Sequence, residues 1–528
     1  MKIEGSLLGQ PIITYRSKGN KRYSPQEIGQ YLRQFTLCKA LAFIGRISFD
    51  NLFTKYRGTL QIKGVPITDG LLAYLSMLLV KNSNDHRGKE MQIDDLLKAI
   101  DMYFGLTDPL LEHERDNIDG YFIRFGAFEF DYSTSIRTNL LSRSLIIFKH
   151  LWTEVDKAKK LDIDNALETI SGLKLEEILA LTNAFVAIST NGFFHLFEPE
   201  APFPEPLKNL TTQDNQIKFV NWIACRYKDF REAYDLNPPI KLEYEKSRFN
   251  PLITKPVLIP DKNLTQSNQR VFLTPIPRLL YMRTTNGLYF NLADFYRRDG
   301  VSNPFRSAFG FVFQEYVGLL LKKSLGEENI RSEWRYGSKK GMKDTPDWFV
   351  IGDKRAILIE VKQSCLNLES KSWGDIETIK ENLKKTIGFG VRQIWQFEND
   401  INSGQYDKLN VFSEIDIFER IVITYDKSYF LNSSLRQQIK NVYTEIPDNY
   451  HWHTISIDEL EYFLHLASSN IFEVLEKKRL DLYTDAMDFQ EYCIQEFPDC
   501  NWSNRYLNDV SEEFLSELGF SESSLKIS

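Results

Sequence analysis

Residues 344–364 read DTPDWFVIGDKRAILIEVKQS, and this stretch decides the fold class of the second half of the chain. Residues 348–351 and 356–361 are rich in β-branched and aromatic side chains. The four residues between them, Gly-Asp-Lys-Arg, are typical of a tight turn. The pattern therefore predicts two adjacent antiparallel strands.

Three charged side chains of this stretch are expected to lie together. Side chains alternate along a strand, so Glu360 and Lys362 project from the same face, and Asp347, which opens the first strand, lies beside Glu360. Two neighbouring carboxylates both ionise at low cost when a cation lies between them, and such hard oxygen ligands suit Mg²⁺ or Mn²⁺. The sequence predicts a divalent-metal site, at which Lys362 orients or helps to deprotonate a bound water.

These residues resemble the PD-(D/E)xK nuclease superfamily, which includes restriction endonucleases, Holliday-junction resolvases and RecB-type exonucleases. Pro346-Asp347 matches the first element of its motif, and Glu360-Val361-Lys362 matches the second. The resemblance implies an α/β sandwich around a mixed sheet and hydrolysis of phosphodiester bonds, most simply by an endonuclease acting on DNA. It also implies a metal ion, Mg²⁺ or Mn²⁺, held by Asp347, Glu360 and the carbonyl of Val361.

The resemblance covers roughly residues 305–460 and adds two candidate residues. Residues 304–325 carry apolar side chains at four-residue spacing and predict a buried helix. Some family members carry an extra metal ligand on this helix, here Glu315; the alternative is a glutamate at the helix edge or paired with a lysine. The helix expected over residues 375–397, with a break near Gly388 and Gly390, carries Gln393, which is expected to contact the nucleotide or the catalytic strand, or else solvent. Residues 420–426 and 453–460 predict two later strands, the second running into a helix.

The Glu-x-Lys formula alone is weak evidence. It recurs at residues 369–371 and 476–478, where no Pro-Asp strand precedes it. Residues 356–361, AILIEV, read instead as a central strand, where an unpaired charge is costly, and this context favours a nuclease over an ordinary hairpin. Two other functions stay open: a degenerate nuclease fold that binds nucleic acid or serves assembly, and an RNA-cleaving toxin.

The length of 528 residues and the hydrophobic fraction of 42% predict two or more domains with ample core. We expect a multidomain α plus α/β architecture. Its parts are a mainly helical recognition or assembly domain over residues 1–245, an extended junction with a hairpin over 246–300, a nuclease domain with a restriction-endonuclease-like α/β sandwich over 301–470, and an acidic helical segment over 471–528.

Local sequence motifs support this division of the chain into domains. Ser24-Pro25-Gln26-Glu27 is a capping box with proline at the first helical position, which predicts a helix start. Prolines recur over residues 238–277 and disfavour helix there. Asn286-Gly287 predicts a hairpin turn between residues 279–282 and 288–291.

Motifs that the sequence lacks narrow the range of expected functions and locations. The sequence holds no GxxxxGK[ST] motif, so any ATP-driven step needs a separate ATPase or other defence subunit. The start, MKIEGSLLGQPIITY, lacks an apolar signal core and no stretch has the length of a membrane span, which predicts a cytoplasmic protein with no membrane contact. The five scattered cysteines suit a reducing compartment. A homo-oligomer is compatible with the sequence.

The net charge of −7 is unevenly distributed. Residues 481–528 hold eleven acids against two basic residues, so the preceding chain is close to neutral. Basic residues flank the motif and suggest a local groove for nucleic acid, most simply DNA, although such clusters also merely solvate a surface. A large unfamiliar module fused to this nuclease motif is similar in architecture to bacterial restriction or anti-phage defence proteins.

Overall fold

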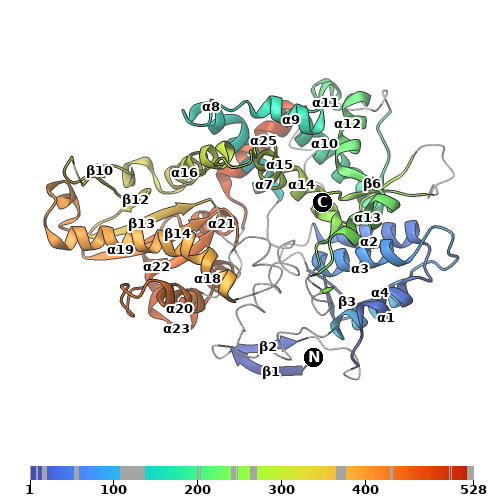
Figure 1. The fold of residues 1–528 in the computed structure, drawn as a ribbon, viewed down its shortest axis with the longest axis horizontal. Coiled ribbons are helices and arrows are strands. Elements are labelled where there is room, and N and C mark those ends of the chain that lie inside the picture. The colour runs from blue at the N-terminus through green and yellow to red at the C-terminus, as the bar shows by residue number, and fades with distance from the viewer. Residues whose placement is uncertain are drawn as a thin grey trace. The chain divides into compact units, whose positions relative to one another are not determined.

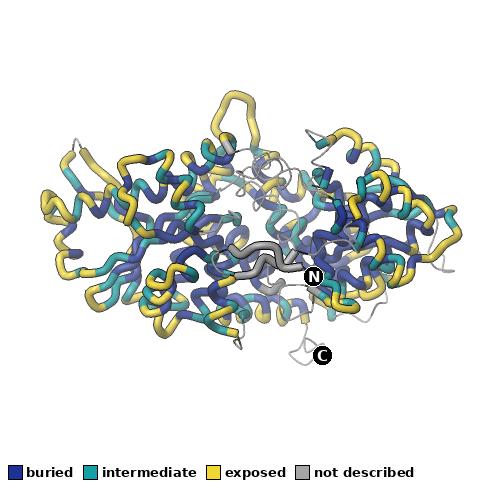
Figure 2. The backbone as a smooth tube through the Cα atoms, turned by 90° about the horizontal axis from the view of Figure 1, so that it is seen from below, coloured by how far each residue is buried: buried dark blue, intermediate teal, exposed yellow. Residues whose placement is uncertain are grey.

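The computed structural model describes residues 2–7, 10–14, 21–52, 59–106, 137–198, 201, 204–239, 245–246, 248–261, 270–339, 341–363, 376–427, 432–498, 500 and 502–519. The chain forms two compact units (Figure 1). The first comprises Met1–Ser144, Leu161–Asn303 and Ser511–Ser528, and the second comprises Leu145–Lys160 and Pro304–Val510. In each unit the buried segments lie inside and the exposed ones outside (Figure 2). The expected multidomain α plus α/β architecture is confirmed.

The described part of the first unit is mainly helical. The expected capping box starts α1, since Ser24 N donates to Glu27 Oε2 at 2.8 Å and Glu27 N donates to Ser24 Oγ at 3.2 Å. The main helices are α1 (Pro25–Leu32), α2 (Leu37–Asn51), α3 (Asp69–Asn82), α4 (Ile93–Phe104), α7 (Arg137–Leu145), α9 (Ile163–Ser171), α10 (Leu175–Ile188), α11 (Glu205–Leu210), α12 (Gln213–Ile223), α13 (Tyr227–Leu236), α14 (Pro277–Thr284) and α15 (Gly287–Phe295).

Short strands accompany these helices. A four-stranded sheet has the order β5-β8-β7-β6, with β5 (Phe193–Phe194), β8 (Phe272–Leu273), β7 (Val257–Ile259) and β6 (Ala224–Arg226). Two antiparallel pairs are β1 (Lys2–Leu7) with β2 (Gln10–Thr14) and β3 (Thr59–Ile62) with β4 (Val65–Thr68).

The prediction of a hairpin around Asn286-Gly287 is wrong, because α14 and α15 occupy this region. Asn286 has φ −57° and ψ −32°, which are helical values, whereas the expected turn needs positive φ. Pro277 sits at the first turn of α14, where its fixed φ suits a helix. Short apolar runs fit a helix as well as a strand, and burial of Leu280 and Leu288 decides for the helices here.

A five-stranded mixed sheet forms the centre of the second unit. Its order is β15-β14-β13-β12-β9, with β15 (His453–Ser456), β14 (Ile417–Thr424), β13 (Arg355–Lys362), β12 (Trp348–Ile351) and β9 (Ile330–Ser332). The pairs β9/β12 and β12/β13 are antiparallel, and β13/β14 and β14/β15 are parallel. The expected strand pair and the two expected later strands are therefore confirmed.

Two long helices cover opposite faces of this sheet. Helix α16 (Pro304–Leu325), which has the bounds expected from the sequence, packs on β9 and β13, and Trp348 Nε1 donates to its Gln314 carbonyl at 2.9 Å. Helix α19 (Ile387–Ser403) packs on β13 and β14, where Phe397 lies 5.6 Å from the ring of Phe349. Neighbouring strand residues point to opposite faces, so these two contacts assign one helix to each face (Figure 1).

The interrupted helix expected over residues 375–397 forms two helices. Helix α18 (Ile376–Lys385) ends at Thr386, whose φ of −118° and ψ of −98° interrupt the helix, and α19 then continues to Ser403. The interruption precedes Gly388 and Gly390, near which it was expected. The second unit further contains β10 (Arg335–Tyr336), β11 (Lys343–Asp344), α20 (Asn432–Val442) and α21 (Ile457–Ala467).

One segment from the first half of the chain belongs to the second unit. It forms a π-helical turn at Ile146–Leu151 and the short helix α8 (Trp152–Glu154), and both pack within this unit. Trp152 stacks on Phe305 of α16 with ring centroids 5.3 Å apart, and Phe148 lies 6.2 Å from Phe309. Residues 1–245 are thus shared between the two units.

The acidic C-terminal segment is helical in its described residues, as expected. It forms α22 (Ile471–Leu480), α23 (Leu482–Ala486), α24 (Phe489–Glu496) and α25 (Arg505–Glu517). Several of its acids have structural partners: Asp485 pairs with Arg436, Glu496 Oε1 lies 2.6 Å from Lys477 Nζ, and Asp488 caps α24. Among the described helices, none combines the length and apolar character that crossing a lipid bilayer requires.

Candidate functional site

The hairpin of β12 and β13 brings Asp347 beside Glu360. Trp348 pairs with Ile359, so one further step along both strands sets Asp347 opposite Glu360. The backbone N–H of Val361 donates to Asp347 Oδ2 at 2.6 Å, which fixes this carboxylate against the neighbouring strand. The turn is closed by a hydrogen bond from Gly352 N to the Arg355 carbonyl.

Glu360 is a buried carboxylate that is half satisfied. Glu360 has 2% relative exposure, and its Oε1 accepts a hydrogen bond from Lys362 Nζ at 2.5 Å. Within the described part of the chain, Oε2 is buried and has no hydrogen-bond partner. An unpartnered buried carboxylate oxygen is costly, so this atom marks a place that suits a cation.

The two carboxyl groups bind protons more tightly than usual. Burial raises the pKa of Asp347 well above its usual value, and the nearby charge of Glu360 raises it further, while Lys362 and the Val361 N–H act against this. Burial also raises the pKa of Glu360, against the opposing effects of Lys362 and of the backbone N–H of Asp347. Without a cation, the pair therefore resists carrying two negative charges.

Helix α19 supplies the surroundings of Lys362. Gln393 Oε1 accepts a second hydrogen bond from Lys362 Nζ at 2.8 Å, so the structure places the expected glutamine against β13. The ring of Phe389 lies 5.2 Å from the same nitrogen. A Cβ on Gly390 would lie 3.2 Å from both Glu360 Cγ and Lys362 Cε, so glycine allows this close approach.

Glu315 is not gathered with the other expected ligands. It lies on α16, which covers the opposite face of the sheet from α19. Burial raises the pKa of Glu315, Lys322 lowers it and Glu333 raises it. Within the described residues, no three histidine, cysteine or acidic side chains are grouped closely enough to hold a metal ion together. Asp347 and Glu360 thus form a two-carboxylate centre in this conformation.

Glu333 is an acidic neighbour of the site that the sequence did not reveal. It follows β9 directly and is exposed. Its negative charge raises the pKa values of both Asp347 and Glu360. The signal in the sequence is slight, because β9 spans three residues and its pairing register is not encoded by any motif.

Many basic residues around the motif already have acidic partners. The shared feature is a lysine or arginine nitrogen within 4 Å of a carboxylate, as in the pairs Arg335–Asp344, Lys343–Asp400, Lys380–Glu377, Lys385–Glu381 and Arg392–Glu445. Exposed pairs of this kind contribute little stability and exchange readily for other anions. The expected basic groove stays a prediction, and Lys340 and Lys371 lie outside the described residues.

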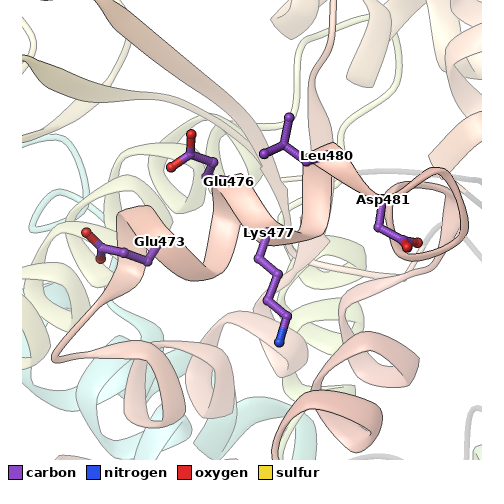
Figure 3. Close-up of a pocket in the computed structure, with 5 residues that line it drawn as sticks. All are labelled: Glu473, Glu476, Lys477, Leu480 and Asp481. Carbon is purple, nitrogen blue, oxygen red and sulfur yellow. The ribbon is translucent and has the colours of Figure 1, made fainter.

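The open hollow along α22 offers no comparable chemistry. It is lined by Glu473, Glu476, Lys477, Leu480 and Asp481, and Lys477 points the opposite way from Glu476 (Figure 3). Arg355 Nη1 lies 3.2 Å from Glu476, and Lys477 pairs with Glu496. Asp481 caps α23, so the charged side chains that line the hollow are engaged by the fold and the hollow has the character of an ordinary surface.

The donor atoms at the strand ends fit a divalent cation. Asp347 and the free Oε2 of Glu360 are hard oxygen donors, and the Val361 carbonyl lies between Glu360 and Lys362 in sequence. No protein-family model matches this chain, no curated protein matches its sequence and no solved structure matches its fold. The functional argument therefore rests on the geometry of these residues.

Proposed function

We propose that this protein is a divalent-metal-dependent nuclease with a restriction-endonuclease-like α/β sandwich in its second unit. Its substrate is a phosphodiester, most simply in DNA, and its setting is bacterial restriction or anti-phage defence. The observation that carries the proposal is the buried pair Asp347 and Glu360, with one oxygen unpartnered, next to Lys362 on the same strand.

Each residue has a distinct role in this proposal. Asp347, Glu360 and the Val361 carbonyl hold Mg²⁺ or Mn²⁺, which when bound polarises the phosphodiester and lowers the pKa of a bound water. Lys362 holds that water in line with the phosphorus and offsets phosphate charge. Gln393 keeps the Lys362 ammonium in place through its 2.8 Å hydrogen bond.

The raised pKa values of the two carboxyl groups support a metal site. A centre that resists two negative charges gains from any cation that replaces the bound proton. Burial also raises the pKa of the fully hydrogen-bonded Asp69, so the feature that favours a cation here is the unpartnered Oε2 of Glu360 next to a second carboxyl group. The glycine at position 390 also fits, because a larger residue would press on both Glu360 and Lys362.

The test is a cleavage assay with the purified full chain. Supercoiled plasmid, linear duplex, single-stranded DNA and RNA are each incubated with Mg²⁺, Mn²⁺ or EDTA. We expect cleavage with either metal and none with EDTA, and the plasmid shows whether the cut is internal. Lys362→Met is the matched variant, since it removes the ammonium but keeps the side-chain length, and it should bind Mn²⁺ while losing cleavage.

Three results count against the proposal. Metal-independent cleavage, or full cleavage by Lys362→Met, would show that another site does the chemistry. Tight binding of nucleic acid with no cleavage of any substrate would favour a degenerate fold used for binding. Cleavage of RNA in preference to DNA would support the proposed metal-dependent hydrolysis but make RNA the substrate. A helical first unit that selects the target, a partner ATPase and a homo-oligomer stay predictions.

A further inference from the structure

One arginine of the first unit is partly buried without an acidic partner. Arg283 lies in the last turn of α14; among the described residues it makes no ion pair, and its Nε is buried without a hydrogen-bond partner. Arg278, on the same helix, pairs with Asp69 at 3.0 Å. Arg231 Nε donates to the Val80 carbonyl at 2.8 Å. A positive charge held away from water without an anion is costly, so an anion bound at Arg283 would stabilise it.

Two further unpartnered donors lie beside this guanidinium. Arg283 Nη1 donates to Asn291 Oδ1 at 2.7 Å, and Arg283 Cζ lies 5.1 Å from the centre of the Trp222 ring. Because a guanidinium has donors only, it holds the oxygen of the Asn291 amide and leaves Nδ2 for another acceptor. Asn291 Nδ2 and Trp222 Nε1 are both buried and have no partner within the described part of the chain, and Trp222 has 7% relative exposure. The unpartnered atoms of this group are all donors, as expected around a missing anion.

A second positive charge lies near this group. Lys255 Nζ donates to the Trp222 carbonyl at 2.6 Å, and an ammonium has further N–H donors to offer. Burial lowers the pKa of Lys255, and the charge of Arg283 lowers it further, while Cys225 and Asp229 act against this. Burial lowers the pKa of Arg283 to about 10, so the guanidinium keeps its charge at pH 7. The two cations therefore repel each other, and an anion between them would offset the repulsion.

We propose that Arg283, Asn291 and Trp222 form a binding site for a phosphate dianion, either as inorganic phosphate or as the terminal group of a phosphomonoester. Such a group carries a charge of about −1.5 to −2 at pH 7 and three acceptor oxygens. Its charge matches the two cations, and its oxygens match the three unpartnered donors, whereas a carboxylate or a phosphodiester carries one charge only. Arg283 and Asn291 are partly exposed, so an ion can reach them from solvent. The site belongs to the first unit and does not depend on the proposed function.

The test is a calorimetric titration of the full-length protein with inorganic phosphate, in EDTA and without divalent metal. Arg283→Gln should weaken phosphate binding roughly 10- to 100-fold, the usual cost of losing charge-assisted hydrogen bonds. Arg298→Gln removes the same charge from an exposed position after α15, and this matched control should bind phosphate as the unmodified protein does. Titration with adenosine monophosphate distinguishes a phosphomonoester from the free ion.

A second variant supplies the missing negative charge from within the chain. Asn291→Asp keeps the size of the side chain and places a carboxylate next to Arg283 Nη1. The melting temperature without phosphate should rise, because the guanidinium gains a counter-ion, and phosphate should no longer bind. This variant also keeps the test decisive if circular dichroism shows that Arg283→Gln does not fold.

Each outcome decides the inference. Absence of phosphate binding to the unmodified chain, unchanged affinity in a folded Arg283→Gln, or an equal loss in Arg298→Gln would overturn it. Retained phosphate binding or a lower melting temperature in Asn291→Asp would also overturn it. Acetate, or an oligonucleotide without a terminal phosphate, that binds as tightly as phosphate would contradict a site for a dianion. Cleavage assays do not enter these titrations, so the inference and the proposed function fail separately.

Discussion

Each unit buries a carboxylate, and the two differ in how completely that carboxylate is satisfied. In the first unit, Asp69 has 0% relative exposure and accepts hydrogen bonds from Arg278 Nε at 3.0 Å, Ser48 Oγ at 2.6 Å and Asn51 Nδ2 at 3.3 Å. In the second unit, Glu360 is equally buried but one of its oxygens has no partner among the described residues.

We expect this difference to separate structural burial of a carboxylate from burial at the proposed metal site. Both Asp69 oxygens are occupied, so its cluster is complete and links α2, α3 and α14 without any ligand. The hydrogen bonding of Glu360 is incomplete. Burying its unpartnered oxygen costs free energy, and a ligand that binds this oxygen would offset that cost. Substitutions in the two clusters should therefore affect different measurements.

The largest effect is expected on catalysis. Asp347→Ala and Glu360→Ala each remove a proposed metal ligand, and metal-dependent cleavage should fall by roughly 10³-fold or more, as when a principal electrostatic contact of a transition state is lost. The rate of plasmid cleavage measures this. Retained cleavage in either variant with a normal circular dichroism spectrum would remove the functional half of the comparison.

The next effect is expected on stability and in the other unit. Asp69→Ala leaves Arg278 buried without its counter-ion, and the free energy of unfolding should fall by about 3–5 kcal/mol. Urea unfolding of the full chain measures the loss. Glu360→Gln removes an unsatisfied buried charge and should leave the unfolding free energy unchanged or higher. Equal losses in the two variants would show that both clusters are structural.

A smaller effect is expected at Gln393. Its oxygen accepts from Lys362 Nζ, so Gln393→Ala should lower the cleavage rate about tenfold by freeing the ammonium, with Mn²⁺ affinity little changed. Gln396→Ala is the control, because this glutamine is exposed on the same helix. A rate in Gln393→Ala equal to that of the control would make Gln393 a surface residue.

The smallest effect is a pH dependence of metal stabilisation. The raised pKa values of Asp347 and Glu360 mean that the folded state holds protons which the unfolded state releases near pH 4. Without metal, the stability due to this pair is present at low pH and is lost as pH rises toward the folded pKa values. Saturating Mg²⁺ should thus raise the melting temperature more at pH 8 than at pH 5, and Glu360→Gln should remove this difference. An equal Mg²⁺ effect at both pH values would place the bound ion elsewhere.

The sequence predicts features that depend on neighbouring residues, and it does not predict features that depend on the pairing register of distant strands. The hairpin, the long helix over residues 304–325 and the neighbourhood of Asp347 and Glu360 follow from alternation and from a four-residue turn. The effect of Glu333 on the two carboxyl groups could not be predicted, because Glu333 follows a three-residue strand whose pairing no motif encodes. The expected hairpin at Asn286-Gly287 failed because tertiary burial outweighed a strong turn signal.

The segment Leu145–Lys160 has a consequence for synthesis of the chain. It leaves the ribosome about 150 residues before α16, against which Phe148 and Trp152 pack. During that interval its aromatic side chains lack their native cover and are exposed to chaperones or to other nascent chains. The second unit therefore matures late, and the site at Glu360 forms after most of the first unit has emerged.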